Sequence, residues 1–216
     1  MWNLTPAQEK ILQSPWQWRL ASVWSPPELE ICDAPAYRQW LDAGNRESHL
    51  AMEIVLALEG EVPMAFNDAV YRFSPGCALF LSPGVEHAFY YPPAYRHFTH
   101  LWLLPAPRAL FADICTGNNR EFYRRLLVSD SPDFCRYLSF EWQRLATMAL
   151  DPVWRRQMLL GLLMSMVNKL ILPPDSDEKP AEESPEDRRR GDIALLCRYI
   201  EEHSGRDISI ARLAAM

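Results

Sequence analysis

The fold of this chain is decided by residues 53–87, EIVLALEGEVPMAFNDAVYRFSPGCALFLSPGVEH. Short runs of β-branched and aromatic residues alternate there with turn signals. These signals are Glu59-Gly60-Glu61, Asn67-Asp68, Ser74-Pro75-Gly76 and Ser82-Pro83-Gly84. Many short strands with this spacing are typical of a sandwich or a barrel. The same texture extends from Arg19 to Pro105, so we expect a β-sandwich or a β-barrel over about residues 19–105.

Beyond Pro107 the apolar spacing becomes helical, and we expect helices over about residues 107–172. Between Asp133 and Leu150 one stripe collects Phe134, Leu138, Trp142, Leu145 and Ala149. Asp151-Pro152 then begins a second long helix that reaches about Leu172. Near the start of the chain, Thr5-Pro6-Ala7-Gln8 forms a capping box and predicts a short helix to about Gln13. The expected fold class is a β-barrel followed by α-helices, α+β overall.

The second long helix is apolar on nearly all sides, so it requires cover on nearly all sides. Its seam, at alternating spacings of four and three residues, consists of Leu159, Leu163, Met166 and Leu170. The barrel can cover one face, which leaves a second covering surface to be found. That surface is either a neighbouring helix of the same chain or the same helix of a second subunit. We expect the second arrangement, a homodimer with these four residues at its interface.

Residues 173–190 are polar and rich in Pro, Glu, Asp and Ser, which is typical of a flexible linker. Helical spacing resumes with Ile193, Leu196 and Ile200, and Asp207-Ile208-Ser209 opens a further helix in which the sequence ends. We therefore expect three parts. They are a first domain over 1–172, a linker over 173–190, and the truncated start of another domain over 191–216.

The composition and the motifs argue against several classes of function. The formal net charge of −6 does not suit a surface that binds nucleic acid, because phosphate binding requires clustered cations. The five cysteines are scattered, and the N-terminus has no signal peptide, so we expect a cytoplasmic protein with reduced thiols. The longest apolar stretch, 158–167, is too short to span a membrane. Since no GxSxG, HExxH or phosphate-binding glycine loop occurs, we expect no enzyme activity and no cofactor.

Two spaced motifs resemble those of the cupin superfamily. They are His49-x3-Glu53-x6-Gly60 and Gly76-x5-Ser82-Pro83-Gly84-x2-His87. In metal-binding cupins, two histidines and a glutamate of the first motif and a histidine of the second hold a divalent metal. The corresponding residues here are Glu47, His49, Glu53 and His87. They define an alternative function, a metal-dependent cupin enzyme of the dioxygenase or isomerase type. In the expected case these positions serve the barrel itself and hold no metal.

The order of parts resembles the AraC family of transcriptional regulators. A cupin barrel, two helices and a polar linker are followed by IALLCRYIEEHSGRDISIARLAAM, residues 193–216. In that family YIEEH and then ISxxxLA open the helix-turn-helix DNA-binding domain. The resemblance implies a domain that binds a small-molecule effector and dimerises. It also implies that DNA is contacted only through the missing remainder of the C-terminal domain.

Sugar-responsive members of the family suggest which residues contact the effector. The matching positions here are Ser25, Glu59, Phe89, His100 and Trp102. His100 and Trp102 are two residues apart on a predicted strand, so both side chains point to the same face. Indole rings stack on the CH face of sugars, and we expect the effector to be a sugar or a similar small molecule. Two alternatives remain: Trp102 only fills the barrel, or the barrel no longer binds a ligand and only dimerises.

Overall fold

A computed structural model describes residues 4–25, 27–46, 48, 52–88, 97–106, 109–117, 122–130 and 132–171. The chain divides into two compact units, 1–172 and 173–216, and the described residues all belong to the first. The expected linker and the start of the expected helix-turn-helix domain therefore lie outside the described residues.

The described residues form four α-helices, one 3-10 turn and eight strands. The helices are α1 (Pro6–Leu12), α2 (Pro35–Asp42), α3 (Pro132–Thr147) and α4 (Pro152–Ile171), and η1 is Pro15–Gln17. The strands are β1 (Arg19–Ser22), β2 (Glu53–Gly60), β3 (Val62–Phe66), β4 (Ala69–Phe73), β5 (Cys77–Leu81), β6 (Phe98–Pro105), β7 (Ala109–Gly117) and β8 (Phe122–Asp130). None of the described helices is long and apolar enough to cross a bilayer.

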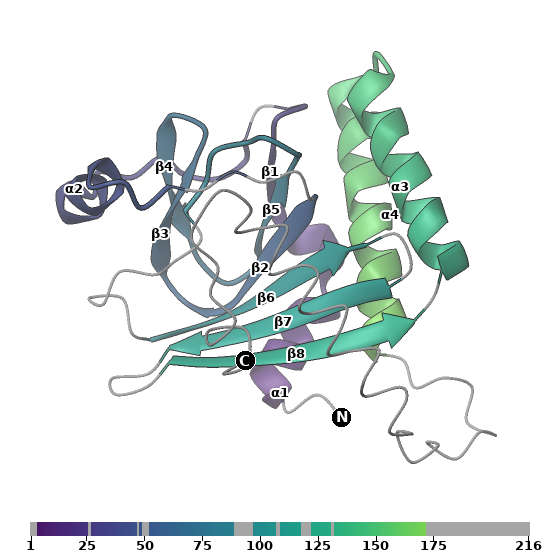
Figure 1. Cartoon of the computed structure of the whole chain (residues 1–216), viewed down its shortest axis with the longest axis horizontal. Coiled ribbons are helices and arrows are strands. Elements are labelled where there is room, and N and C mark those ends of the chain that lie inside the picture. The colour runs from purple at the N-terminus through teal and green to yellow at the C-terminus, as the bar shows by residue number, and fades with distance from the viewer. Residues whose placement is uncertain are drawn as a thin grey trace, which may run out of the picture. The chain divides into compact units, whose positions relative to one another are not determined.

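Six strands form one mixed sheet in the order β1-β5-β2-β6-β7-β8, and β3 and β4 form a separate hairpin (Figure 1). The expected closed barrel is therefore wrong, because within the described residues β1 pairs only with β5 and β8 only with β7. The hairpin folds over one face of the sheet instead of continuing it. Two layers then bury the apolar side chains without the ring of hydrogen bonds that a barrel needs. The α+β class is confirmed.

One face of the large sheet, here called the helix face, carries Leu56, Leu101 and Ala112. These side chains share one buried cluster with α3 and α4, which lie side by side along the sheet (Figure 1). The helical members of the cluster are Leu12 of α1; Cys135, Leu138, Trp142 and Leu145 of α3; and Leu159, Leu160, Leu162, Leu163, Met166 and Val167 of α4. This face is the apolar core of the unit.

The opposite face, here called the inner face, carries His100 and Trp102 and lies against the β3–β4 hairpin. Asn67 and Asp68 make a two-residue turn in that hairpin, and Asn67 adopts a positive φ of 52°. Asparagine tolerates this left-handed conformation better than other non-glycine residues. The far side of the hairpin packs on Tyr37 and Leu41 of α2, a helix that the strand pattern of the region did not predict.

Residues 109–130 correct the expectation that everything beyond Pro107 is helical. They form β7 and β8, which pair with each other over nine residues in antiparallel register. The two-residue alternation of a strand is visible in Leu110, Ala112 and Ile114, which alternate with residues of the inner face. Gly117-Asn118-Asn119 also provides a turn signal between the two strands.

The helix starts are better predicted. Thr5 and Gln8 form the reciprocal capping box of α1, with Gln8 N to Thr5 Oγ1 at 3.3 Å and Thr5 N to Gln8 Oε1 at 3.0 Å. The side chain of Asp151 accepts a hydrogen bond from the backbone N–H of Val153 at the start of α4. Both helices therefore begin where a side chain accepts from an N–H of the first turn, as the sequence predicts.

Candidate functional site

The inner face brings together side chains that apolar cores normally exclude. Glu53, His87, His100 and Asp113 are each at most 3% exposed, and they lie around the equally buried indole of Trp102. Burying ionisable groups costs free energy, so such a group is kept where it performs a task or completes a network. This set is the candidate functional site.

Strand register explains how these residues come together. Trp102 of β6 is paired with Val55 of β2 on one side and with Asp113 of β7 on the other. Directly opposed residues in antiparallel strands have Cβ atoms about 4.5–5.5 Å apart. The Asp113 carboxylate and the Trp102 indole are therefore neighbours on one face.

His87 and Glu53 form the second polar pair of the site. His87 Nε2 lies 3.6 Å from Glu53 Oε2, and the imidazole centroid lies 6.4 Å from that of Trp102. His87 Nδ1 is 2.9 Å from the carbonyl oxygen of Val85. A carbonyl only accepts, so Nδ1 carries a hydrogen and donates it, which turns Nε2 toward the glutamate.

His100 lies in the most apolar part of the inner face. Its ring packs edge-on to Phe73 at 5.1 Å between centroids and tilted against Phe98 at 5.0 Å. Complete burial lowers the pKa of His100 to about 3. The imidazole is therefore neutral at physiological pH and offers one donor and one acceptor.

The alternative metal set is brought together only in part. Glu53 and His87 are neighbours, while Glu47 and His49 lie outside the described residues. Among the residues that the structure describes, no three His, Cys, Asp or Glu side chains converge in a way that could hold a metal ion. Glu53 and His87 are thus two of the four residues of this set, and the structure places them beside each other.

Glu59 does not join His100 and Trp102, because a β-bulge redirects it. The β2–β6 register shifts between Ala57 and Glu59, so Ala57 faces His100 whereas Glu59 faces Thr99 on the helix face. There Glu59 Oε2 accepts from Gln8 Nε2 at 2.9 Å and from Thr99 Oγ1 at 3.2 Å. Gln8 Nε2 also donates to Thr99 Oγ1, at 3.2 Å, so the three side chains anchor α1 to the sheet.

Gly60 follows the bulge, and a separate structural reason requires glycine at this position. Its φ is +71°, and a Cβ built there would lie 1.8 Å from the carbonyl oxygen of His97. Only glycine permits this approach of β2 to the start of β6.

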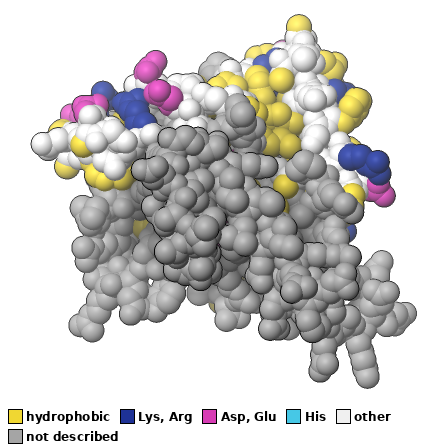
Figure 2. Space-filling view, in the orientation of Figure 1, with side chains coloured by type: hydrophobic (Ala, Val, Ile, Leu, Met, Phe, Trp, Pro, Cys, Tyr) yellow, Lys and Arg dark blue, Asp and Glu magenta, His cyan; other side chains and the backbone are white. Residues whose placement is uncertain are grey.

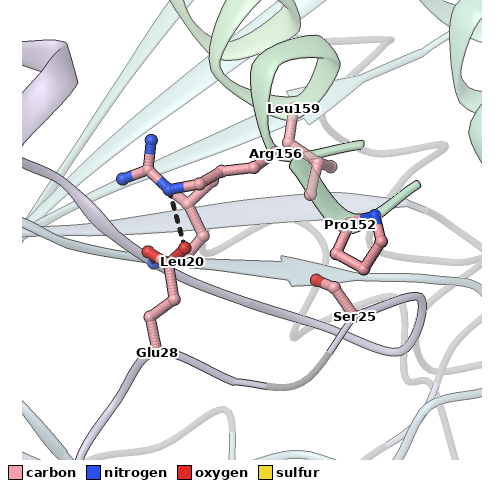
Figure 3. Close-up of a pocket in the computed structure, with 6 residues that line it drawn as sticks. All are labelled: Leu20, Ser25, Glu28, Pro152, Arg156 and Leu159. Atoms are coloured by element: carbon pink, nitrogen blue, oxygen red, sulfur yellow. Dashed lines mark hydrogen bonds and ion pairs between the residues drawn. The ribbon is translucent and has the colours of Figure 1, made fainter. Parts of the chain in front are cut away.

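Ser25 is also separated from the buried site. Its hydroxyl lies 3.0 Å from that of Ser22, a residue of β1, and it lines a cavity against the first turns of α4 (Figure 3). This cavity belongs to the helix-face side of the molecule. Of the five expected effector contacts, His100 and Trp102 are together, Ser25 and Glu59 lie elsewhere, and Phe89 is outside the described residues.

Sequence reasoning missed Asp113, because residues 107–172 were expected to be helical. The signal that identifies it is an acidic residue between alternating apolar residues, Ala112 and Ile114, in a segment bounded by turn residues. An acid at the buried phase of a strand is unusual enough to suggest a site.

The residues expected at a dimer interface are covered within one chain. Leu159, Leu163 and Met166 have no exposed surface and pack in the apolar core of the helix face. The side chain of Leu170 lies outside the described residues. The neighbouring α3 and the sheet provide the cover for these three residues.

Comparison with protein families agrees with this arrangement of sheet, hairpin and helices. Residues 33–150, more than half of the chain, match the AraC-like ligand binding domain. The chain belongs to this family. Membership indicates effector sensing in a regulator of transcription rather than an enzyme, and domains of this family are cupin-like. Neither the curated proteins nor the solved structures contain a significant match to the chain.

Proposed function

We propose that this AraC-like domain binds a polyhydroxylated small molecule, such as a sugar, on the inner face of its sheet. The observation that carries the proposal is the indole of Trp102 with Asp113 beside it on the neighbouring strand and the His87–Glu53 pair nearby. Binding of this effector regulates the DNA-binding part of the intact protein.

The chemistry of the site suits hydroxyl groups. Carboxylates accept hydrogen bonds from hydroxyls, and the neutral His100 imidazole both donates and accepts. An indole face packs against the CH face of a pyranose or furanose ring. Such a ligand offers hydroxyl groups to these polar side chains, which a purely apolar ligand cannot do.

A screen by thermal shift tests this proposal. The panel contains monosaccharides and disaccharides, with aliphatic acids and aromatic compounds of similar size as comparison classes. We expect at least one sugar to raise Tm, and we expect Trp102→Phe and Asp113→Asn each to weaken its binding at least tenfold. Trp40→Phe is the matched control, because Trp40 lies on α2 and packs against the cluster on the far side of the hairpin. No stabilisation by any sugar, or equal binding by Trp102→Phe, would contradict the proposal.

Dimerisation forms the second part of the proposed function. Hydrophobic side chains gather over α3 and α4 on the visible surface (Figure 2). The exposed apolar residues of these helices and their connection are Tyr137, Phe140, Met148, Val153 and Trp154. Since the seam of α4 is already covered, a second copy would contact these residues instead.

Sedimentation of the full chain tests the dimer. We expect Phe140→Glu to shift the protein toward monomer, because a buried unpaired charge opposes association. Val23→Glu, which changes an exposed apolar residue outside these helices, serves as control. A monomeric parent protein, or a Phe140→Glu variant as dimeric as the parent, would exclude this interface.

The metal-dependent enzyme remains a second candidate, favoured by the 3.6 Å approach of His87 to Glu53. Metal analysis of protein purified without chelator separates the two functions. Stoichiometric iron, manganese or zinc that is lost in both His87→Ala and His49→Ala would support the enzyme.

A further inference from the structure

A small cavity lies between α4 and the segment that follows β1, and the buried effector site does not include it. Its volume is about 190 Å³, and it is lined by Leu20, Ser25, Glu28, Pro152, Arg156 and Leu159 (Figure 3). A cavity of about 150 Å³ is large enough to bind benzene, so this one can hold a molecule of about six to eight non-hydrogen atoms.

The cavity offers an apolar wall. Leu20 and Leu159 are 2% and 0% exposed, and the ring of Pro152, the first residue of α4, stands beside them. A short hydrocarbon chain that packs beside these side chains would be partly removed from water.

The polar wall is formed by the ion pair between Arg156 and Glu28, in which Arg156 keeps more unused hydrogen-bonding groups than Glu28 does. Arg156 Nε donates to Glu28 Oε1 at 2.6 Å, and the backbone N–H of Leu20 donates to Glu28 Oε2 at 3.0 Å. Both carboxylate oxygens therefore already accept a hydrogen bond. Arg156 also donates from Nη2 to the carbonyl oxygen of Trp18 at 2.8 Å.

The guanidinium of Arg156 has five N–H groups, and its two hydrogen bonds in the described part of the chain use two of them. Ser22 Oγ accepts from the backbone N–H of Trp24 and lies 3.0 Å from Ser25 Oγ. When Ser22 donates to Ser25, the hydroxyl hydrogen of Ser25 is left for another acceptor. Three N–H groups of Arg156 thus remain for an acceptor in the cavity, and the Ser25 hydroxyl can add one more donor.

We propose that this cavity binds a short aliphatic carboxylate. Its oxygens would accept from Arg156 and Ser25, and its chain would pack on Leu20, Leu159 and Pro152. The site lies on the opposite side of the sheet from His100 and Trp102, so it is independent of the proposed effector site.

The position of the cavity gives the ligand a mechanical effect. Arg155 and Arg156 of α4 already donate to the backbone carbonyl oxygens of Trp24 and Trp18, respectively. A carboxylate between the same two segments would hold α4 more firmly to the start of the sheet. Binding would therefore raise Tm.

Butyrate is the probe for the experiment, with 1-butanol and n-butylamine as analogues of equal chain length. Binding to the full chain is followed by titration calorimetry and by thermal shift. We expect butyrate to bind and raise Tm, and we expect butanol and butylamine to bind at least tenfold more weakly. No binding of butyrate at millimolar concentration, or equal binding of butanol, would overturn the proposal.

Two variants locate the site. Arg156→Met should weaken butyrate binding at least tenfold, whereas Arg144→Met, which removes a cation from α3 outside the cavity, should not. If Arg156→Met fails to fold, Ser25→Leu decides, because it fills the cavity and retains the Glu28–Arg156 pair. Butyrate binding that is unchanged in Ser25→Leu would overturn the proposal.

Discussion

The two faces of the six-stranded sheet are both buried, but they are built from different residues. The helix face packs Leu56, Leu101 and Ala112 against α3 and α4 as a continuous apolar core. The inner face places Glu53, His100 and Asp113 at the same depth. An equal degree of burial therefore has two energetic consequences, because apolar packing stabilises the unit whereas buried polar groups cost free energy that their hydrogen bonds must offset.

The sharpest test of the comparison is the stability of the helix face. Leu163 is fully buried in α4, and Leu163→Ala should lower the free energy of unfolding by about 2–5 kcal/mol. Gln157→Ala, at an exposed position of the same helix, should change it by less than about 0.5 kcal/mol. Urea denaturation measures both. A loss below about 1 kcal/mol for Leu163→Ala would show that this layer is not the main source of stability.

The buried histidine of the inner face should make the stability of the folded unit depend on pH. An unfolded histidine titrates near 6.5, whereas the pKa of buried His100 is about 3, so acid favours the unfolded chain. This contribution to stability is fully present above pH 6.5 and decreases as the pH falls toward 3. By pH 5 the loss is about 2 kcal/mol.

His100→Gln removes that term, since glutamine does not titrate. Denaturation of the parent and the variant at pH 7 and pH 5 gives the difference between their slopes. Equal slopes in the two proteins would mean that His100 is accessible to protons in the folded state.

The next largest effect on stability is expected for the side chains that anchor α1 to the sheet. Gln8→Ala removes the donor to Glu59 and Thr99 together with the acceptor for the backbone N–H of Thr5, and it should cost about 1–2 kcal/mol. Limited proteolysis should then cut the N-terminal segment faster. Thr5→Ala, which removes only the capping hydroxyl, should cost about 1 kcal/mol without affecting the link to the sheet. Equal cleavage rates in Gln8→Ala and the parent would argue against the anchor.

The smallest effect is expected on the outer surface of α3. Glu141 accepts from Arg144 at 2.8 Å in a partly exposed pair. Glu141→Gln should change the free energy of unfolding by less than about 0.5 kcal/mol, because solvent screens such pairs. Thermal denaturation at low and high salt checks this. A change above about 0.5 kcal/mol at low salt would mean that this surface pair makes a measurable contribution to the free energy of unfolding.

Much of the fold was predictable from local chemistry. The capping box at Thr5, the turn at Asn67-Asp68 and the start of α4 follow from side chains that act on their own neighbours. The pairing of His100 with Trp102 on one face follows from the period of a strand. These predictions required no knowledge of distant contacts.

Other features depend on contacts that no short segment encodes. β7 and β8 satisfy their backbone hydrogen bonds only by pairing with each other and with β6, so their apolar residues alone did not separate strand from helix. The cover of Leu163 by the chain's own α3 and sheet likewise depends on tertiary packing. Asp113 was not predicted as a site residue, because its strand was expected to be helical. The open sheet was expected to be a barrel, because both have the same spacing of strands along the sequence.

The β-bulge in β2 decides which side of the sheet receives the carboxylate of Glu59. The irregularity between Ala57 and Glu59 places Glu59 opposite Thr99 and gives its carboxylate to α1 instead of to the interior. If β2 paired in simple alternation at its present length, Leu58 would face Thr99 and Glu59 would turn to the inner face, leaving Gln8 and Thr99 without their acceptor. Deleting Leu58 would remove the bulge and leave Glu59 opposite Thr99, so the carboxylate would stay with α1. A single irregular residue therefore keeps an acid out of the interior and uses it to hold the N-terminal helix.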